Sequence, residues 1–299
     1  MKESKFSIDF VGLGAKKAGT TWLYTCLKQH PEVCFPRKKE LFFFNEYDTN
    51  FPTVKNGKYE LGLEWYESQF VDCSEGKIKG EISPTYLYCK FAARRIKKHI
   101  PKVKLIVTLR DPIARALSQY IDHKKTGITR NISFEKAINE DPTLIDRGLY
   151  YKHLSYYFSL FPKENILVLF LEDMKINPKK ELFKIYRFLN LRDRDFIPRN
   201  YKSVPNPSTE AIFQPLNYLL MHIEYGLKRY GLHFIVNFLD RTGIRRLIVS
   251  VKNLNSLPLK KNPEIRKKTI DDLRDIFRDD VIGLEKFLGK NLTSWKEPK

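Results

Sequence analysis

The residues between Val11 and Leu23 combine glycines, lysines and threonines at spacings that suit the binding of an anion. An apolar run up to Leu13 leads into a turn that contains Gly14, and a helical pattern follows from about Thr20. A turn of this kind aims free backbone N–H groups and the positive end of the helix dipole at one point. The stretch therefore predicts a phosphate-binding loop between a strand and a helix.

Two well-known loops do not fit this stretch. Gly12 and Gly14 open like a dinucleotide fingerprint, but the third glycine of that fingerprint would fall on Lys17. Gly14 and Gly19 have the spacing of a nucleotide-triphosphate P-loop, which requires lysine directly after the second glycine, where Thr20 stands. Lys17 lies before Gly19 instead, on the opposite flank of the turn. We therefore expect it to meet a compact anion with only one phosphate in the chain.

A second group suited to phosphate follows another apolar run. Arg110 stands at the end of the run Val103–Leu109, and Ser118 lies eight residues later on a predicted helix. A guanidinium fork and a hydroxyl both suit phosphate oxygens. Taken alone, an ion pair explains Arg110 and a helix surface explains Ser118. Because Arg110 and Ser118 occur together and follow a predicted phosphate-binding loop, a shared role in phosphate binding explains them better than chance does.

Lys17–Leu23 resembles the 5′-phosphosulfate-binding loop of the sulfotransferases that use 3′-phosphoadenosine 5′-phosphosulfate (PAPS), where Lys-x-Gly-Thr-Thr-Trp-Leu is a common form. Arg110 and Ser118 resemble the pair that holds the 3′-phosphate of PAPS in this family. The resemblance covers nearly the whole chain and is strongest to bacterial and heparan sulfate members. Further matching segments are Lys39–Phe44, Leu61–Tyr66, Gly80–Tyr86 and Gly289–Trp295. It implies a sulfotransferase with PAPS as donor, 3′-phosphoadenosine 5′-phosphate (PAP) as product, and no required metal.

The resemblance also implies roles for the loop residues. Lys17 would neutralise the oxygen that bridges sulfur and the leaving phosphate. The residues that would hold the 5′-phosphate through backbone and hydroxyl groups are Ala18, Gly19, Thr20 and Thr21. Trp22 would stack on the adenine, although packing on the sheet explains an aromatic residue at this helix position nearly as well.

The reaction needs a base, because sulfuryl transfer is an in-line displacement in which the protein positions the reactants, stabilises charge and removes the acceptor's proton. Glu40 is the first candidate, since its segment resembles the one that carries the catalytic glutamate in the heparan sulfate enzymes. His123 is the reserve candidate, one or two helical turns beyond Ser118. A histidine on a basic helix is, however, more often simply exposed.

The chain departs from the heparan sulfate 3-O type at three positions. That type has arginine where Thr21 stands, histidine where Phe42 stands and lysine where Ile82 stands. Residues that contact a polysaccharide are therefore not reproduced. The acceptor stays open between hydroxyl and amine groups on a sugar, a lipid or a phenol, with carbohydrate as one candidate.

The elements that must position these residues follow from hydrophobic periodicity. Short apolar runs occur at Phe6–Leu13, Lys79–Ile82, Val103–Leu109 and Ile166–Leu171. Helical patterns follow most of them, which predicts an α/β fold with a parallel sheet covered by helices on both faces, P-loop-like by the resemblance. Thr20 or Thr21 is expected to cap a helix that runs to His30, and Asp111 a helix that begins at Pro112. Both helices start at the carboxyl ends of strands, where such sheets bind ligands.

The chain is expected to form a single domain over residues 1–299. Residues 208–255 are aromatic and amphipathic and predict a helical subregion on the acceptor side; attachment to a membrane surface is the less favoured interpretation. A final helical segment, Asn262 to Leu288, closes the fold. Trp295 is expected to fix the tail.

Composition restricts the class of protein. Hydrophobic residues make up 42% of the 299, which excludes a disordered chain. Cys26, Cys34, Cys73 and Cys89 show neither CxxC spacing nor a nearby histidine, so neither a disulfide framework nor a zinc module is expected, and a reducing compartment is the simpler interpretation. No run approaches the length of a membrane span, and no signal-peptide pattern opens the chain, which together predict a cytoplasmic protein.

Two other functions compete with sulfuryl transfer. The net charge of +19 attracts anions, nucleic acid among them, but no nucleic-acid module motif is present and such a function leaves Lys17, Arg110 and Ser118 unexplained. A nucleotide or small-molecule kinase would need the P-loop lysine and an acid that binds magnesium. Asp111 could supply that acid, but a helix cap explains it better.

Overall fold

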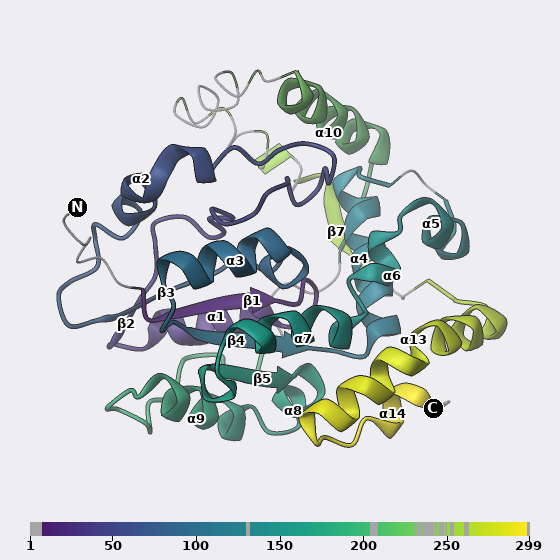
Figure 1. Cartoon of the computed structure of the whole chain (residues 1–299). Helices are drawn as coiled ribbons and strands as arrows, with labels where there is room; N and C mark the ends of the chain where they lie inside the picture. The colour runs from purple at the N-terminus through teal and green to yellow at the C-terminus, as the bar shows by residue number, and fades with distance from the viewer. Residues whose placement is uncertain are drawn as a thin grey trace.

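The computed structural model describes residues 8–129, 132–203, 209–230 and 263–297, and between 231 and 262 only residues 232, 235, 242, 244, 248, 250, 251 and 254–259. Five parallel strands form the central sheet in the order β2-β3-β1-β4-β5 (Figure 1). Their bounds are Phe10–Gly14 for β1, Val33–Cys34 for β2, Ile78–Ile82 for β3, Lys104–Leu109 for β4 and Ile166–Phe170 for β5. The predicted α/β fold with a parallel sheet is confirmed. The short edge strand β2 had no sequence signal.

Helices cover both faces of the sheet (Figure 1). On the face of Val11 and Val107 pack α3 (Lys90–His99), α4 (Pro112–Thr126), α7 (Tyr150–Leu160) and α13 (Lys267–Leu288). On the face of Phe10 and Ile106 pack α1 (Thr20–Gln29) and α9 (Pro178–Leu189). Neighbouring strand residues thus point to opposite cores, as the pleat of a strand requires. This explains why the strands appear as unbroken apolar runs rather than as alternating patterns.

Shorter elements complete the described part of the chain. The helices are α2 (Gly62–Ser68), α5 (Phe134–Glu140), α6 (Thr143–Asp146), α8 (Leu171–Ile176), α10 (Gln214–Arg229) and α14 (Thr293–Lys296). Strands β6 (Thr209–Ala211) and β7 (Ser256–Pro258) pair antiparallel, apart from the main sheet. Helix α10 lies within the predicted helical subregion 208–255, much of which falls outside the described residues. The expected terminal helix is α13, and Trp295 is buried between the rings of Tyr150 and Phe170.

The two predicted helix caps had different outcomes. The Asp111 carboxylate accepts a hydrogen bond from the N–H of Ala114 at 2.7 Å, and Pro112 is the first helical residue, as predicted. The threonine cap was wrong: Gly19 is the N-cap of α1, and no side chain caps that helix. The chain enters α1 through a left-handed residue (φ 95°), a conformation that glycine adopts at little cost. The threonines therefore belong to the first turn of the helix.

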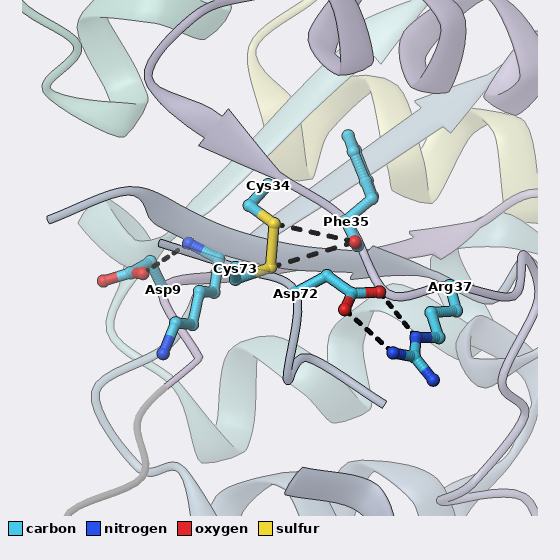
Figure 2. Close-up of a disulfide and its surroundings, with 7 residues drawn as sticks. Asp9, Cys34, Phe35, Arg37, Asp72 and Cys73 are labelled. Atoms are coloured by element: carbon cyan, nitrogen blue, oxygen red, sulfur yellow. Dashed lines mark hydrogen bonds and ion pairs between the residues drawn. A yellow bond between two sulfur atoms is a disulfide. The ribbon is translucent and has the colours of Figure 1, made fainter. Parts of the chain in front are cut away.

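The expectation for the cysteines was wrong for one pair. A disulfide joins Cys34, at the end of β2, to Cys73, which follows α2 (Figure 2). Beside it the guanidinium of Arg37 donates two hydrogen bonds to the Asp72 carboxylate, at 2.5 and 2.8 Å (Figure 2). The cysteines are 39 residues apart, and only the packing of α2 beside the sheet edge brings them together, which a search for short spacings does not detect. The argument from cysteine usage for a reducing compartment therefore fails.

No helix within the described ranges has both the length and the apolar composition needed to cross a membrane. Helix α10 does carry exposed apolar side chains, among them Leu219 and Ile223. Its other face is attached to the end of α4, where the Asn217 side chain donates to the carbonyl of Lys125 at 2.6 Å. A Cβ at Gly127 would approach the Asn217 backbone to 2.5 Å, so only glycine permits this contact.

Candidate active site

A cavity of about 650 Å³ opens at the carboxyl ends of β1, β3 and β4. Its lining includes eight of the residues that the sequence singled out: Lys17, Gly19, Thr20, Thr21, Trp22, Glu40, Arg110 and Ser118. Ala18 is fully buried beneath the loop, and His123 lines a different cavity. The groups proposed for both ends of PAPS thus face one space.

The loop between β1 and α1 is shaped by backbone conformations that suit close approach to an anion. Gly14 has φ 131°, and a Cβ there would lie 2.2 Å from the carbonyl oxygen of Pro84. Lys17 (φ 68°) and Gly19 (φ 95°) are left-handed on either side of Ala18. The loop then enters α1, whose first N–H groups have no acceptor within the helix. The backbone N–H groups of the loop and of the first turn of α1 together form a concave group of hydrogen-bond donors that suits an anion.

Two lysines of this loop share one carboxylate. Lys17 Nζ lies 3.1 Å from Asp122 Oδ1, and Lys16 Nζ lies 3.8 Å from Asp122 Oδ2. Burial opposes ionisation of Asp122, but the charges of Lys17 and Lys16 outweigh it and hold the pKa of that carboxyl below its usual value. Burial lowers the pKa of Lys16 to about 8. Asp122 therefore fixes the Lys17 ammonium at the mouth of the phosphate loop.

Arg110 joins the ends of two neighbouring strands. Its Nη1 donates to the carbonyl oxygen of Lys17 at 3.3 Å, so the β4 arginine touches the loop that follows β1. The hydroxyl of Tyr150 donates to the Arg110 carbonyl at 2.8 Å and fixes its backbone. Burial lowers the pKa of Arg110, although the guanidinium stays charged at neutral pH. The charges of the Glu172 and Asp111 carboxylates act on this guanidinium, but among the described residues neither forms an ion pair with it, and its side chain lines the cavity.

Ser118 and Trp22 reach the same cavity from two helices. Ser118 lies two turns along α4 from Arg110 and lines the cavity. Trp22 is only 7% exposed and belongs to the core between the sheet and α9, and its Nε1 donates to the carbonyl of Tyr201 at 2.7 Å. Both explanations offered for Trp22 thus have a physical basis, since its ring packs in the core and also touches the cavity. Stacking on adenine stays a prediction.

Glu40 lies on the segment between β2 and α2 and lines the cavity. Its neighbours are held in place: the N–H of Phe42 donates to Ser83 Oγ at 3.0 Å, and Lys58 Nζ donates to the Leu41 carbonyl at 2.6 Å. Burial raises the pKa of Glu40, against the opposing charges of Lys39 and Lys16. In the described part of the chain its carboxylate accepts no hydrogen bond, so its oxygens remain available to a substrate proton.

His123 is not in this cavity. It is 4% exposed, contrary to the expectation of an exposed position, because α5 and the turn that follows it cover this face of α4. Its Nδ1 lies 3.0 Å from Asp141 Oδ2. The ring lines a neighbouring cavity of about 450 Å³, and Thr49 and Asn50 line both spaces. The two candidate bases therefore occupy adjoining spaces.

Several lining residues were missed by sequence analysis. Lys16 and Asp122 had usable signals, because Lys16 adjoins Lys17 and Asp122 lies four residues after Ser118 on the same helix face. Phe42, Pro84 and Thr85 lie in the matching segments Lys39–Phe44 and Gly80–Tyr86 but were not singled out. The lining residues that were missed without a local signal are Leu171, Met174, Lys175, Tyr201, Lys202 and Ser203. Leu171, Met174 and Lys175 lie on α8, and the others come from loops; only the fold brings them to the strand ends.

Comparison with known proteins gives a consistent result. A family model described as "Sulfotransferase domain" matches residues 7–205. Heparan sulfate glucosamine 3-O-sulfotransferase 6 of Homo sapiens is 31% identical over 187 residues, which cover 60% of this chain and 51% of that protein. Membrane-associated sulfotransferase kil1 of Dictyostelium discoideum is 33% identical over 147 residues, or 46% of this chain and 29% of that protein. The chain spans about half the length, or less, of these relatives.

A solved structure shares the fold. The sulfotransferase from Alicyclobacillus acidocaldarius superposes with a TM-score of 0.69 at 21% sequence identity. The match covers 98% of this chain and 100% of that one. The arrangement of the sheet and its helices is thus common to both proteins.

Proposed function

The chain belongs to the sulfotransferase domain family, and from that premise we propose that it transfers the sulfuryl group of PAPS to a hydroxyl or amine acceptor. One observation carries the proposal: Arg110 contacts the carbonyl of Lys17 at 3.3 Å, and both side chains line the same cavity. Two cationic groups at neighbouring strand ends can hold opposite ends of one doubly phosphorylated adenosine.

The residues of the cavity fit such a donor. The curled loop from Lys17 to Thr21 offers backbone donors and hydroxyls to the 5′-phosphate, and Arg110 with Ser118 offers a fork and a hydroxyl to the 3′-phosphate. The donor supplies an activated sulfuryl group. Lys17 stabilises the negative charge that develops on the leaving phosphate, and Asp122 holds its ammonium in position.

Glu40 is the proposed general base. Its carboxylate lines the cavity without a hydrogen-bond partner among the described residues, so it can take the acceptor's proton. Its raised pKa strengthens it as a base once it is ionised. His123 remains the reserve candidate, held by Asp141 in the adjoining cavity.

The acceptor is proposed to be a carbohydrate, by analogy with relatives whose names specify heparan sulfate glucosamine. Thr21, Phe42 and Ile82 differ from the heparan sulfate 3-O pattern, so the acceptor need not be that polysaccharide. The cytoplasmic location expected from the sequence stays a prediction, and the Cys34–Cys73 disulfide counts against it. Two further expectations also stay predictions: that the protein has no nucleic-acid partner, and that it does not attach to a membrane surface.

Calorimetry tests the donor assignment. We expect PAP to bind at least about 10-fold more tightly than ATP with magnesium, a difference of about 1.4 kcal/mol. The physical reason is that the loop beside Lys17 is suited to a single 5′-phosphate, and Arg110 can bind a second phosphate at the ribose 3′ position. PAP has both groups, whereas ATP has a 5′-triphosphate and no 3′-phosphate. Tighter binding of ATP with magnesium would reject the proposal and favour a kinase.

A further inference from the structure

The cavity that contains His123 is walled by several elements and adjoins the proposed transfer site. His123 comes from α4, Asp141 from the turn after α5, Thr143 from the start of α6, and Tyr218 from α10. Arg147 follows α6. Thr49 and Asn50 line this cavity and the transfer cavity together. A molecule that extends from Glu40 past these two residues would therefore enter it.

Arg147 is a buried cation that forms no ion pair with any residue that the structure describes. Its side chain is 7% exposed, Nη2 donates to the carbonyl of Thr49 at 3.0 Å, and Nη1 has no partner among the described residues. The nearest acids are engaged elsewhere. Lys152 Nζ lies 2.6 Å from the Asp146 carboxylate, and Asp141 accepts from the N–H and hydroxyl of Thr143. Burial of an unpaired guanidinium is costly unless a ligand supplies the missing anion.

His123 adds a second orphaned polar group in the same cavity. With Nδ1 held by Asp141 at 3.0 Å, the ring has its Nε2 free, and this buried atom has no partner in the described part of the chain. In the neutral ring that has its proton on Nδ1, Nε2 accepts a hydrogen bond, for example from a hydroxyl. At the exposed rim, Lys136 and Glu140 lie 3.8 Å apart and largely cancel in charge. The Asp141 carboxylate also lines the cavity, but it accepts from His123 and Thr143. Arg147 Nη1 is therefore the cationic donor of this cavity that has no partner among the described residues.

We propose that this cavity is the subsite for an acidic group of the acceptor, a carboxylate or a sulfate ester bound by Arg147, with an adjacent hydroxyl donating to His123 Nε2. Two unpartnered polar atoms in one cavity carry the inference. A planar guanidinium suits both oxyanions. The identity of the ligand as an acceptor rests on the proposed function, but the anion subsite itself does not.

Matched sugars test the subsite by calorimetry in the presence of PAP. Methyl β-D-glucuronide, methyl β-D-glucoside 6-sulfate and methyl β-D-glucoside differ in the group at one position, which is a carboxylate, a sulfate ester or a neutral hydroxymethyl. We expect the wild-type protein to bind at least one of the acidic sugars about 10-fold or more tightly than the neutral one. The preferred acid distinguishes a carboxylate from a sulfate ester.

Variants assign the preference to Arg147. Arg147→Gln should abolish the preference for the acidic sugar and leave the affinity for PAP unchanged, and Arg147→Lys should restore part of the preference. Arg278→Gln removes an exposed arginine paired with Asp275 on α13, and it should keep the full preference. Equal binding of all three sugars by the wild type, or a preference that survives in Arg147→Gln, overturns the subsite. The wild-type comparison holds even if Arg147→Gln fails to fold.

The outcomes separate this inference from the proposed function. If PAP does not bind but an acidic sugar is still preferred in its absence and the preference depends on Arg147, the donor assignment fails and the anion subsite stands. If PAP binds and no acidic sugar is preferred, the donor assignment stands and the subsite fails.

Discussion

The residues proposed to bind PAPS form the donor side of the site, and those proposed to bind the acceptor, in the same cavity and in the adjoining cavity of His123, form the acceptor side. The two sides are built from different kinds of chain segment. On the donor side, Arg110 directly follows β4 and Lys17 lies in the short loop after β1, and helices begin within a few residues of each. On the acceptor side, Glu40, Thr49 and Arg147 lie on loops away from the ends of the sheet strands. A site on strand ends inherits its geometry from the sheet, whereas a site on loops depends on contacts far along the chain.

Charge is also handled differently on the two sides. Lys17 has a carboxylate partner in Asp122 at 3.1 Å. Arg147 has none within 4 Å in the described residues, and the free Nε2 of His123 shares its cavity. On the donor side Lys17 is thus paired before any ligand binds, whereas Arg110 on that side and Arg147 on the acceptor side have no carboxylate within 4 Å in the described residues.

The largest expected effect is on the acceptor side, from Glu40→Gln. Loss of the base should lower turnover by about 10²- to 10⁴-fold, because the amide cannot take the acceptor's proton. The affinity for PAP, measured by calorimetry, should not change, since the donor side is untouched. Full activity in Glu40→Gln would transfer the role of base to His123.

The pH profile gives a second measure of the same residue. Burial raises the pKa of Glu40 above the usual glutamate value of 4.5. A base must be ionised, so kcat/KM should fall as the pH falls through this raised pKa, and the acid limb should lie above pH 4.5. An acid limb that persists unchanged in the residual activity of Glu40→Gln would assign that limb to another group.

Lys17→Ala should lower turnover by about 10²- to 10³-fold on the donor side, because the charge on the leaving phosphate loses its nearest cation. The affinity for PAP should fall far less, since Arg110 and the loop backbone remain. Lys179→Ala, at an exposed lysine near the start of α9, is the matched control and should keep full turnover. Equal losses of turnover and PAP affinity would place Lys17 in ground-state binding instead.

Arg110→Ala should act on binding rather than on chemistry. Removal of the guanidinium should weaken PAP by about 10- to 100-fold, the range for hydrogen bonds to charged groups. Adenosine 5′-phosphate, which lacks the 3′-phosphate, should bind the wild type and the variant equally. A similar loss for both nucleotides would place Arg110 elsewhere than at the 3′-phosphate. Arg94→Ala, on the exposed face of α3, is the control.

The donor side could be predicted from the sequence because its signals are local. Gly14, Lys17 and Gly19 lie within six residues, and Asp111–Pro112 is a cap signal on its own. The threonine cap failed because Gly19 takes a left-handed conformation that composition does not reveal. The sequence thus placed the loop correctly between β1 and α1 but misassigned the residue that starts the helix.

Apart from Glu40, the acceptor side could not be predicted, because long-range contacts build it. Asp48, next to Thr49, is held by Lys228 of α10 at 2.9 Å, across 180 residues of sequence. His123 was expected to be exposed, since its neighbours on α4 are basic, but α5 and Asp141 bury it. The loops that line the cavity of His123 follow no hydrophobic periodicity. The sequence therefore contains no pattern that would predict this cavity or the role proposed for Arg147.

The smallest effect on activity is expected from removal of the disulfide, which closes the segment that carries Glu40. Cys34 and Cys73 are separated by 39 positions in the sequence, for which loss of the cross-link costs up to about 4 kcal/mol in the chain-entropy model. For a chain of this length the melting temperature should fall by about 6 °C or less. Turnover at a permissive temperature should stay near the wild-type value, because the bonds from Phe42 to Ser83 and from Lys58 to Leu41 still hold the segment around Glu40.

The double variant Cys34→Ser with Cys73→Ser is to be melted with and without dithiothreitol beside the wild type. The reductant should lower the melting temperature of the wild type and leave that of the double variant unchanged. A large loss of turnover in the double variant would show that the disulfide, rather than those two hydrogen bonds, positions Glu40. The acceptor side would then depend on redox conditions, whereas the donor side, whose residues lie outside the loop closed by Cys34 and Cys73, would still bind PAP.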